Sequence, residues 1–450
     1  MKRIFWTVLF FISLFHIEAE SQDKKWTLED CISYAVTNNI GLKRQQLQTE
    51  TSQVNMLKSS LDLLPSLNFG SDARLGFGRS IDPVTNMITF EQNISNSYSL
   101  SSNINIFTGF AALNTIAANR FMYKAGLESE KVARNTLIIE ILGQYYQVLY
   151  TKGLEEASKM QLQLSEEQNF RISKMVETGK EALSRQYEME SQVSADRLSY
   201  TIAHNNASQS LTTLKQLLQI EPETPFDLLF PDTKNILIPN DTYDPDSVYA
   251  IAAQTLPRLK SIEYELKANR KLVAAAMGRI APAISVGGSV FTGYYKLLTN
   301  DSISQRSYSE QLKNNNSQAL YFSLDIPLFN NYAYGRNIKA AKIRKEDTAL
   351  RLEQEKNSLY TEIENACLNY TRGKDEYLAA QANLEFNNKS FAAVEKKFET
   401  GLVGVTDFSA AKTTLFRAES EALRTKLQMV IRKLTLCFYT TGDYENIIFN

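Results

Sequence analysis

The sequence predicts a mainly α-helical protein with a small β part, built as a tandem duplication of one unit. Three observations predict it: long segments without helix-breaking residues, motifs that recur at nearly one spacing, and four segments in which apolar and polar residues alternate. The 450 residues include only 18 glycines and 10 prolines, where average usage would give about 30 and about 22. This deficit indicates long uninterrupted helices.

Composition excludes several classes of protein. The chain is 43% hydrophobic, and its 49 basic residues balance 50 acidic ones. Because nucleic-acid-binding domains usually carry a clustered basic excess, we expect no nucleic-acid partner. Intrinsic disorder is excluded because the combination of low hydrophobicity and high net charge is absent. A helical membrane protein is excluded because no run of about 18 apolar residues follows the N-terminal segment.

The N-terminus has the pattern of a secretory signal peptide, which we place at residues 1–21. Lys2 and Arg3 precede an apolar run over residues 4–15, and Ala19-Glu20-Ser21 is a small-x-small cleavage site. The alternative, an N-terminal membrane anchor, requires a longer apolar run.

The three cysteines are Cys31, Cys367 and Cys437. An odd and widely spaced set does not suit a disulfide scaffold. We expect each of them to be a small apolar residue on a helix.

Four recurring motifs indicate the duplication. Two of them recur at a shift of 217 residues: Leu42-Lys43 as Leu259-Lys260, and Pro65 as Pro282. The other two recur at a shift of 222 residues: Ile104-Asn105-Ile106-Phe107 as Ile326-Pro327-Leu328-Phe329, and Glu177-Thr178-Gly179 as Glu399-Thr400-Gly401. The matches keep the same order along the chain, as a duplication requires. We therefore predict a first repeat at residues 22–219, a proline-rich connector at 220–245, a second repeat at 246–440 and a short tail at 441–450.

Each repeat is expected to contain one helix, two strands and then two helices. The first helices are predicted at residues 28–61 and 246–279, the long helices at 111–178 and 333–400, and the return helices at 183–218 and 406–438. At about 1.5 Å per residue, each long helix measures roughly 100 Å, which exceeds a globular core. The helices must therefore pack side by side as long coiled-coil-like hairpins.

Four segments alternate between apolar and polar residues and are predicted as strands. The positions predicted to face lipid are Leu67, Phe69, Leu75, Phe77, Leu100, Ile104, Val286, Val290, Phe322, Leu324 and Ile326. Strands of about 10–12 residues span a bilayer when tilted, and glycine, serine and asparagine on the opposite face suit a water-filled lumen. The connections at residues 80–97 and 296–318 are predicted as long polar loops. The alternative is two soluble hairpins packed on a core, which would show the same alternation. The signal peptide favours the membrane interpretation over this alternative.

Four strands are too few to close a barrel in lipid. Open edges there leave backbone groups unpaired, and known barrels begin at about eight strands. The chain must therefore oligomerise, as a dimer, a trimer or a tetramer.

Two segments resemble the TolC-like outer membrane efflux protein family. The segment Trp26-Thr27-Leu28-Glu29-Asp30-Cys31 is similar to the start of family members, and residues 399–407 resemble their helical-hairpin tip. Together with the duplicated order of helices and strands, the resemblance covers nearly the whole mature chain. It implies a homotrimer with a twelve-stranded transmembrane β-barrel in outer membrane lipid and a periplasmic α-barrel formed by the helical hairpins. It also implies a periplasmic adaptor (membrane fusion) protein and, through it, an inner-membrane transporter, for efflux or type I secretion of drugs, metals or proteins.

The resemblance places a periplasmic aperture at the hairpin tips. The candidate site residues are Gly179, Arg185, Gly401, Thr406 and Asp407. Asp407 occupies the first acidic position of the family's second tip, but the next acidic position is Ala410, so a double ring of carboxylates is weakened. Because Arg185 stands at the repeat-equivalent position of Asp407, we hypothesise that pairs of these two residues, within or between protomers, latch the closed aperture. The alternative is solvated helix-cap charges, with Thr406 and Asp407 as an N-cap pair.

No enzymatic site, metal or cofactor is expected. His16 leaves with the signal peptide, so His204 is the one histidine of the mature chain, which removes histidine-based metal sites and Ser-His-Asp catalysis. The phosphate-binding GxxxxGKS/T loop and the HExxH motif are both absent from the sequence. Energy must therefore come from a partner. The alternative function is a secreted fibrous coiled-coil protein such as an adhesin stalk, which gives no reason for repeated strands of bilayer length.

Overall fold

The computed structural model describes residues 25–81, 86–90, 92–229, 242–298, 306–442 and residue 444. The predicted signal peptide, much of the connector and most of the C-terminal tail lie outside these residues. The chain forms two compact units. The helical unit comprises Met1–Arg44, Lys131–Leu256 and Ser358–Asn450, and the strand unit comprises Gln45–Glu130 and Pro257–Asn357. Both predicted repeats therefore contribute to both units.

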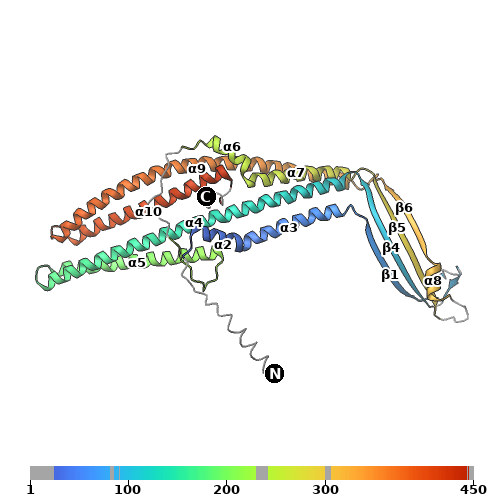
Figure 1. Ribbon diagram of the computed structural model, residues 1–450, viewed down its shortest axis with the longest axis horizontal. Helices are drawn as coiled ribbons and strands as arrows, with labels where there is room; N and C mark the ends of the chain where they lie inside the picture. The colour runs from blue at the N-terminus through green and yellow to red at the C-terminus, as the bar shows by residue number, and fades with distance from the viewer. Residues whose placement is uncertain are drawn as a thin grey trace, which may run out of the picture. The chain divides into compact units, whose positions relative to one another are not determined.

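Two pairs of antiparallel helices confirm the mainly helical prediction. The long helices α4 (Ala111–Glu177) and α9 (Ala333–Glu399) have 67 residues each, or about 100 Å. The return helices are α5 (Leu183–Leu218) and α10 (Val405–Thr441). Figure 1 shows α5 turning back along α4 and α10 turning back along α9, as two hairpins.

The first helix of each repeat is two helices, where the sequence predicted one. They are α2 (Leu28–Asn38) and α3 (Ile40–Leu61) in the first repeat, and α6 (Pro245–Thr255) and α7 (Pro257–Gly278) in the second. Asn39 leaves the helical conformation, and its Oδ1 accepts a hydrogen bond of 3.0 Å from the Leu42 amide, as an N-cap does. Leu256 also leaves it, because the residue before Pro257 is disfavoured from the helical region.

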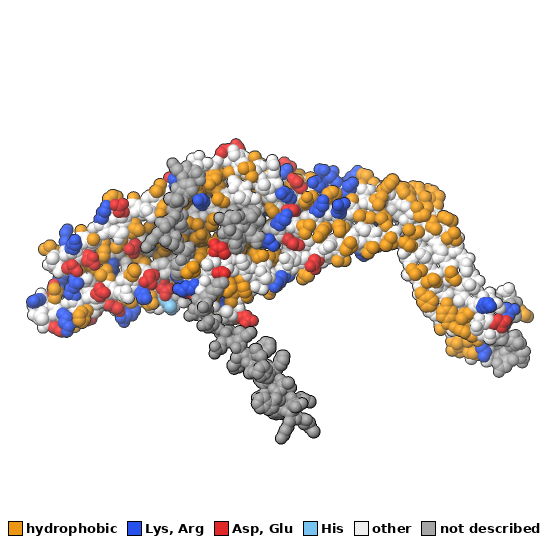
Figure 2. Space-filling model, in the orientation of Figure 1, with side chains coloured by type: hydrophobic (Ala, Val, Ile, Leu, Met, Phe, Trp, Pro, Cys, Tyr) orange, Lys and Arg blue, Asp and Glu red, His pale blue; other side chains and the backbone are white. Residues whose placement is uncertain are grey.

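A four-stranded antiparallel sheet forms in the order β1-β4-β5-β6. Its strands are β1 (Ser66–Gly76), β4 (Asn93–Thr108), β5 (Ala283–Leu297) and β6 (Ser317–Asp325). Phe69 lies opposite Leu100, and Val286 lies opposite Phe322, so the predicted lipid-facing residues within the strands share one face. Phe77 and Ile326 lie just beyond the ends of β1 and β6. Figure 2 shows hydrophobic side chains gathered over the strands.

The two connections predicted as loops contain regular structure. The first holds a short hairpin of β2 (Ser80–Ile81) and β3 (Ile88–Thr89), and the second holds helix α8 (Tyr308–Asn314). Gln311 of α8 is 3% exposed. Its side-chain amide donates to the Tyr295 carbonyl and accepts from the Tyr295 amide, both at 3.0 Å. Gln311 therefore supplies hydrogen-bond partners for the Tyr295 backbone at the edge of β5, where β5 extends past β6.

The helical unit has an apolar core in which Cys31, Ile138, Ile141 and Leu214 are fully buried. The expectation for the cysteines is confirmed, because all three lie on helices and none forms a disulfide. Burial raises the pKa of the Cys31 thiol to about 12, which leaves it protonated and unreactive.

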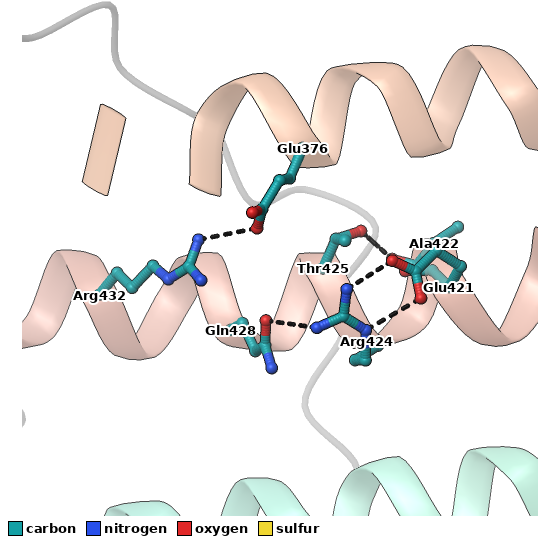
Figure 3. Close-up of polar contacts among 7 residues, drawn as sticks. All are labelled: Glu376, Glu421, Ala422, Arg424, Thr425, Gln428 and Arg432. Carbon is teal, nitrogen blue, oxygen red and sulfur yellow. Dashed lines mark hydrogen bonds and ion pairs between the residues drawn. The ribbon is translucent and has the colours of Figure 1, made fainter. Parts of the chain in front are cut away.

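Polar side chains join the helices of the second hairpin. Arg432 on α10 donates to Glu376 on α9 at 3.0 Å, as Figure 3 shows. About two turns nearer the tip, Arg424 donates to Glu421 and Gln428 of its own helix, at 2.9 Å in each case. None of the described helices is both long enough and apolar enough to cross a membrane.

Candidate functional site at the hairpin tips

Both hairpins turn through the same backbone motif. Gly179 has φ +72° and its amide donates to the Val176 carbonyl at 2.9 Å, while the Lys180 amide donates to the Met175 carbonyl at 2.8 Å. The second tip repeats both bonds, from Gly401 (φ +78°) and the residue after it. This is a Schellman motif, whose left-handed residue is usually glycine. Open space surrounds the Cβ position of both glycines, so backbone conformation rather than crowding requires them.

Arg185 lies half-buried between the two hairpins. Its Nη1 donates to the Glu181 carboxylate at 2.6 Å, and its Nη2 donates to the Val403 carbonyl at 3.1 Å. The guanidinium also lies over the ring of Phe398, 5.1 Å from the centroid, in a cation–π contact. Since Val403 and Phe398 belong to the second repeat, Arg185 fastens the first tip to the second.

Thr406 and Asp407 are exposed in the first turn of α10. The N-cap of this helix is Gly404, without a side-chain capping bond, so the N-cap interpretation of Thr406 and Asp407 is wrong. Asp407 still lies where the helix dipole favours a negative charge. Within one protomer the hydrogen bonds of Arg185 go to Glu181 and Val403, and the structure does not bring Arg185 and Asp407 together.

An apolar cluster, here the tip cluster, packs next to Arg185. Its buried members are Ile172, Met189, Phe398, Val405 and Phe408. The rings of Phe398 and Phe408 stack with centroids 4.4 Å apart. Beside the cluster, Arg171 on α4 forms an ion pair of 2.8 Å with Glu399 on α9. Both hairpins of the chain therefore contribute to one packed tip.

A buried ion pair between Lys412 and Asp196 was not predicted from the sequence. The Lys412 side chain on α10 is 2% exposed; its Nζ donates to the Asp196 carboxylate of α5 and, at 2.5 Å, to Ser165 of α4. Gln192 donates to the other Asp196 oxygen at 3.0 Å. Burial lowers the pKa of the Lys412 ammonium, and the hydrogen bond and charge of Asp196 partly oppose that shift.

The position of Lys412 in the apolar pattern of α10 could have predicted that its side chain is buried. Val405, Phe408, Lys412 and Leu415 follow a 3-4-3 spacing, which is the spacing of the seam in a coiled coil. A lysine on a seam is buried unless its side chain escapes to solvent. The burial of Lys412 was not predicted, because charged residues on a helix are ordinarily solvated.

No cofactor site emerges from the geometry of the tips. Among the described residues, no group of three or more His, Cys, Asp or Glu side chains is placed to hold a metal ion. The tips instead present packed apolar residues, exposed charges and a fixed backbone turn.

Known proteins are similar to this chain in sequence. Residues 248–441 match the family model described as outer membrane efflux protein. Toxin and drug export protein A of Aggregatibacter actinomycetemcomitans is 19% identical over 424 residues, covering 93% of this chain and 87% of that protein.

Solved structures of outer membrane channels share the fold. The CmeC outer membrane channel of Campylobacter jejuni superposes with a TM-score of 0.77 at 16% identity, over 94% of this chain and 88% of that one. The open state of the MtrE outer membrane channel of Neisseria gonorrhoeae superposes with a TM-score of 0.73 at 18% identity, over 93% of this chain and 89% of that one.

Proposed function

The chain belongs to the TolC-like outer membrane efflux protein family, non-enzymatic channels of the Gram-negative outer membrane, and from this premise we propose that three copies assemble into one export duct. The observation that supports assembly is that both the sheet and the helical layer of the strand unit end in unpaired edges. The duct takes cargo from an inner-membrane transporter through a periplasmic adaptor.

The edges of the sheet are β1 and β6. Among the described strands, β1 pairs with β4 alone and β6 with β5 alone. A spanning sheet in lipid must close, because unpaired backbone groups there cost several kcal/mol each. β1 and β6 have 11 and 9 residues and run in opposite directions, so β1 of one copy can pair antiparallel with β6 of the next. Three copies then contribute the twelve strands of a closed barrel.

The helices of the strand unit repeat the order of the strands. Hydrogen bonds join α3 to α4 (Asn119 to the Asn55 carbonyl, 3.3 Å), α4 to α7 (Ser129 and Ser261, 2.8 Å) and α7 to α9 (Asn269 to Thr348, 2.9 Å). The layer order is therefore α3-α4-α7-α9, and its edge helices precede β1 and follow β6.

The edge helix α3 has an unpartnered apolar stripe. Ile40, Leu47, Val54 and Leu61 recur every seven residues and are 60–61% exposed. On the opposite edge helix α9, Ile343 and Leu350 are also seven apart and exposed. Exposed heptad stripes are typical of helices that pack on another helix. We propose that α3 of one copy packs against α9 of the next and closes the helical layer as the strands close the sheet.

The exposed tips are the proposed adaptor contact and aperture. Leu402 is 76% exposed beside the exposed Thr406 and Asp407. Because Arg185 is engaged within its own protomer, the latch hypothesis now requires Asp407 to meet a basic group of a neighbouring copy. The Aggregatibacter relative is named for toxin and drug export, which supports toxins or drugs as the class of cargo.

Photo-cross-linking in intact cells tests the partner proposal. A photoreactive residue at Thr406 is expected to capture a periplasmic adaptor. The same residue at Phe322, on the lipid-facing side of β6, is the matched control and is expected to capture no periplasmic protein. Absence of a periplasmic partner at Thr406, or capture of the same protein at both positions, contradicts the proposal.

A further inference from the structure

The helices next to the sheet carry charge of one sign. The last part of α7, at residues 267–278, and the first part of α9, at residues 333–345, contain no acidic residue. They contain eight basic residues, here the basic band: Lys267, Arg270, Lys271, Arg336, Lys339, Lys342, Arg344 and Lys345. All of them except Lys345 are exposed. Figure 2 shows Lys and Arg side chains gathered over α7, close to the strands. In a chain of balanced charge, the basic band is a local excess.

Ion pairs leave the basic band unneutralised. The charges that join α7 to α9 are Arg258 with Glu355 and, at 3.1 Å, Arg351 with Glu265. Both pairs lie farther from the sheet than the band does. Where the structure describes the chain, none of the eight residues of the band forms an ion pair. Their charges are therefore available to a partner.

Neighbouring helices do not neutralise the basic band either. Residues 111–127 of α4 add Arg120 and Lys124 and no acidic residue. The edge helix α3, which the proposed assembly places against α9 of another copy, has three basic residues and one acidic residue. At the strand ends, Asp62 and Asp325 line one cavity together with Arg279, which offsets one of the two carboxylates. The excess of positive charge therefore persists in the assembly.

Exposed aromatic residues mark the boundary between the sheet and these helices. Phe110 is 61% exposed, Phe329 84% and Tyr332 73%. Both connections into the long helices turn through two left-handed residues, Gly109-Phe110 (φ +60° and +61°) and Asn331-Tyr332 (φ +52° and +60°). This conformation is strained for a bulky side chain, yet it recurs in both repeats. Because aromatic residues are enriched at the level of lipid headgroups, the connections place the headgroup layer at the end of α7 and the start of α9.

The basic band begins at that depth. Arg336 follows Tyr332 by four residues, or about 6 Å along the helix, and Lys345 lies about 20 Å from Tyr332. A headgroup layer is about 5–7 Å thick, and the potential of a charged surface falls off over about 8 Å at physiological ionic strength. The first residues of the band therefore lie beside the headgroups, and the others lie within about two such lengths. Each Lys or Arg near an anionic membrane surface strengthens binding about fivefold.

We propose that the basic band binds the headgroups of anionic phospholipids in the periplasmic leaflet of the outer membrane. The position of the band favours lipid as the partner, because lipid-facing strands and exposed aromatic residues adjoin it in the same unit. The bound phosphates neutralise the band and fix the depth at which the sheet stands in the bilayer. This inference rests on the proposed function, because it requires the sheet to span lipid.

Tryptophan fluorescence of the mature protein in vesicles tests the inference. Phe329→Trp places a reporter beside the band, and Trp26→Phe removes the other tryptophan of the mature chain. The protein is reconstituted into phosphatidylcholine vesicles in which either brominated phosphatidylglycerol or brominated phosphatidylcholine replaces part of the lipid. Bromine quenches the reporter, so the ratio of the two quenching strengths measures the preference for an anionic headgroup.

Two triple variants are compared with this parent. Both remove three exposed positive charges from α9, the first within the band and the second, as the matched control, at the other end of the helix. They are Lys339→Gln/Lys342→Gln/Arg344→Gln and Lys389→Gln/Lys396→Gln/Lys397→Gln.

The parent and the control are expected to prefer phosphatidylglycerol about fivefold or more, and the band variant about twofold or less. Equal quenching by the two lipids in the parent overturns the inference, as does a band variant that keeps the parent's preference. Loss of the preference in inorganic phosphate, but not in potassium chloride of equal ionic strength, shows a site for free phosphate and also overturns it. Failure of the parent to float with phosphatidylcholine vesicles contradicts the proposed channel function itself.

Discussion

Removing the ammonium of Lys412 should destabilise the helical unit more than any surface substitution. Lys412→Met keeps most of the side-chain volume but leaves the Asp196 carboxylate buried without its cation. Loss of one partner of a buried pair costs about 3–5 kcal/mol. Because Asp196 retains hydrogen bonds from Ser165 (2.5 Å) and Gln192 (3.0 Å), we expect the lower end, about 3 kcal/mol per copy.

The double variant Lys412→Met/Asp196→Leu distinguishes an unpaired charge from lost packing. Replacing both charges by apolar residues removes the uncompensated carboxylate, so stability should return to within about 1 kcal/mol of the parent. Lys389→Met is the matched control, because Lys389 pairs with Glu385 on an exposed helix face and such pairs contribute at most about 1 kcal/mol.

The assay is thermal unfolding of the detergent-solubilised protein, followed by the far-ultraviolet circular dichroism of its helices at one fixed protein concentration. The midpoint should fall clearly for Lys412→Met and recover in the double variant. Equal midpoints for Lys412→Met and Lys389→Met would show that the buried pair does not stabilise the fold. A double variant less stable than the single one would show that lost packing, and not the unpaired carboxylate, causes the destabilisation.

Four further outcomes are expected. Gly179→Ala should destabilise the first tip by about 1–2 kcal/mol, because alanine disfavours its positive φ. Gly143→Ala, on the exposed face of α4, should stabilise the protein by about 1 kcal/mol, because alanine favours a helix more than glycine does. The thermal midpoint should therefore fall for the first variant and rise for the second. Gln311→Leu should cost about 2 kcal/mol, since two hydrogen bonds to Tyr295 are lost, and urea unfolding against an exposed Glu310→Gln control measures it. Asp407→Ala should raise single-channel conductance, and an unchanged value contradicts the latch. Burial raises the pKa of the Glu419 carboxyl above its usual 4.5, so ionisation of Glu419 destabilises the fold above that pH. Glu419→Gln should therefore have a higher thermal midpoint than the parent at pH 7. The difference between the two midpoints should disappear as the pH falls below 4.5.

Local patterns predicted the long helices well. The predicted ends at residues 178 and 400 lie one residue past the observed ends of α4 and α9, because the terminating glycines act through local backbone geometry. The alternation along the strands also predicted which residues share a face, since side-chain direction in a strand depends on position alone.

Features that depend on distant partners were not predicted. The break at Asn39 arises from a cap inside a continuous helical pattern. The role of Gln311 requires Tyr295, sixteen residues earlier in the chain. The burial of Lys412 requires two helices of the other repeat. For Arg185 the sequence placed the residue at the tip, but its partners were set by the packing of Val403 and Phe398 against it.

Native mass spectrometry of the protein extracted from outer membranes measures directly how many copies form the channel. A closed channel requires both edges of the sheet and of the helical layer to meet neighbouring copies. We expect one dominant species with the mass of three mature chains, which changes to monomer when charged residues replace Leu47 and Val54 on α3. A monomer in the unaltered protein, or recovery of the chain from the soluble secreted fraction instead of the membrane, would contradict it.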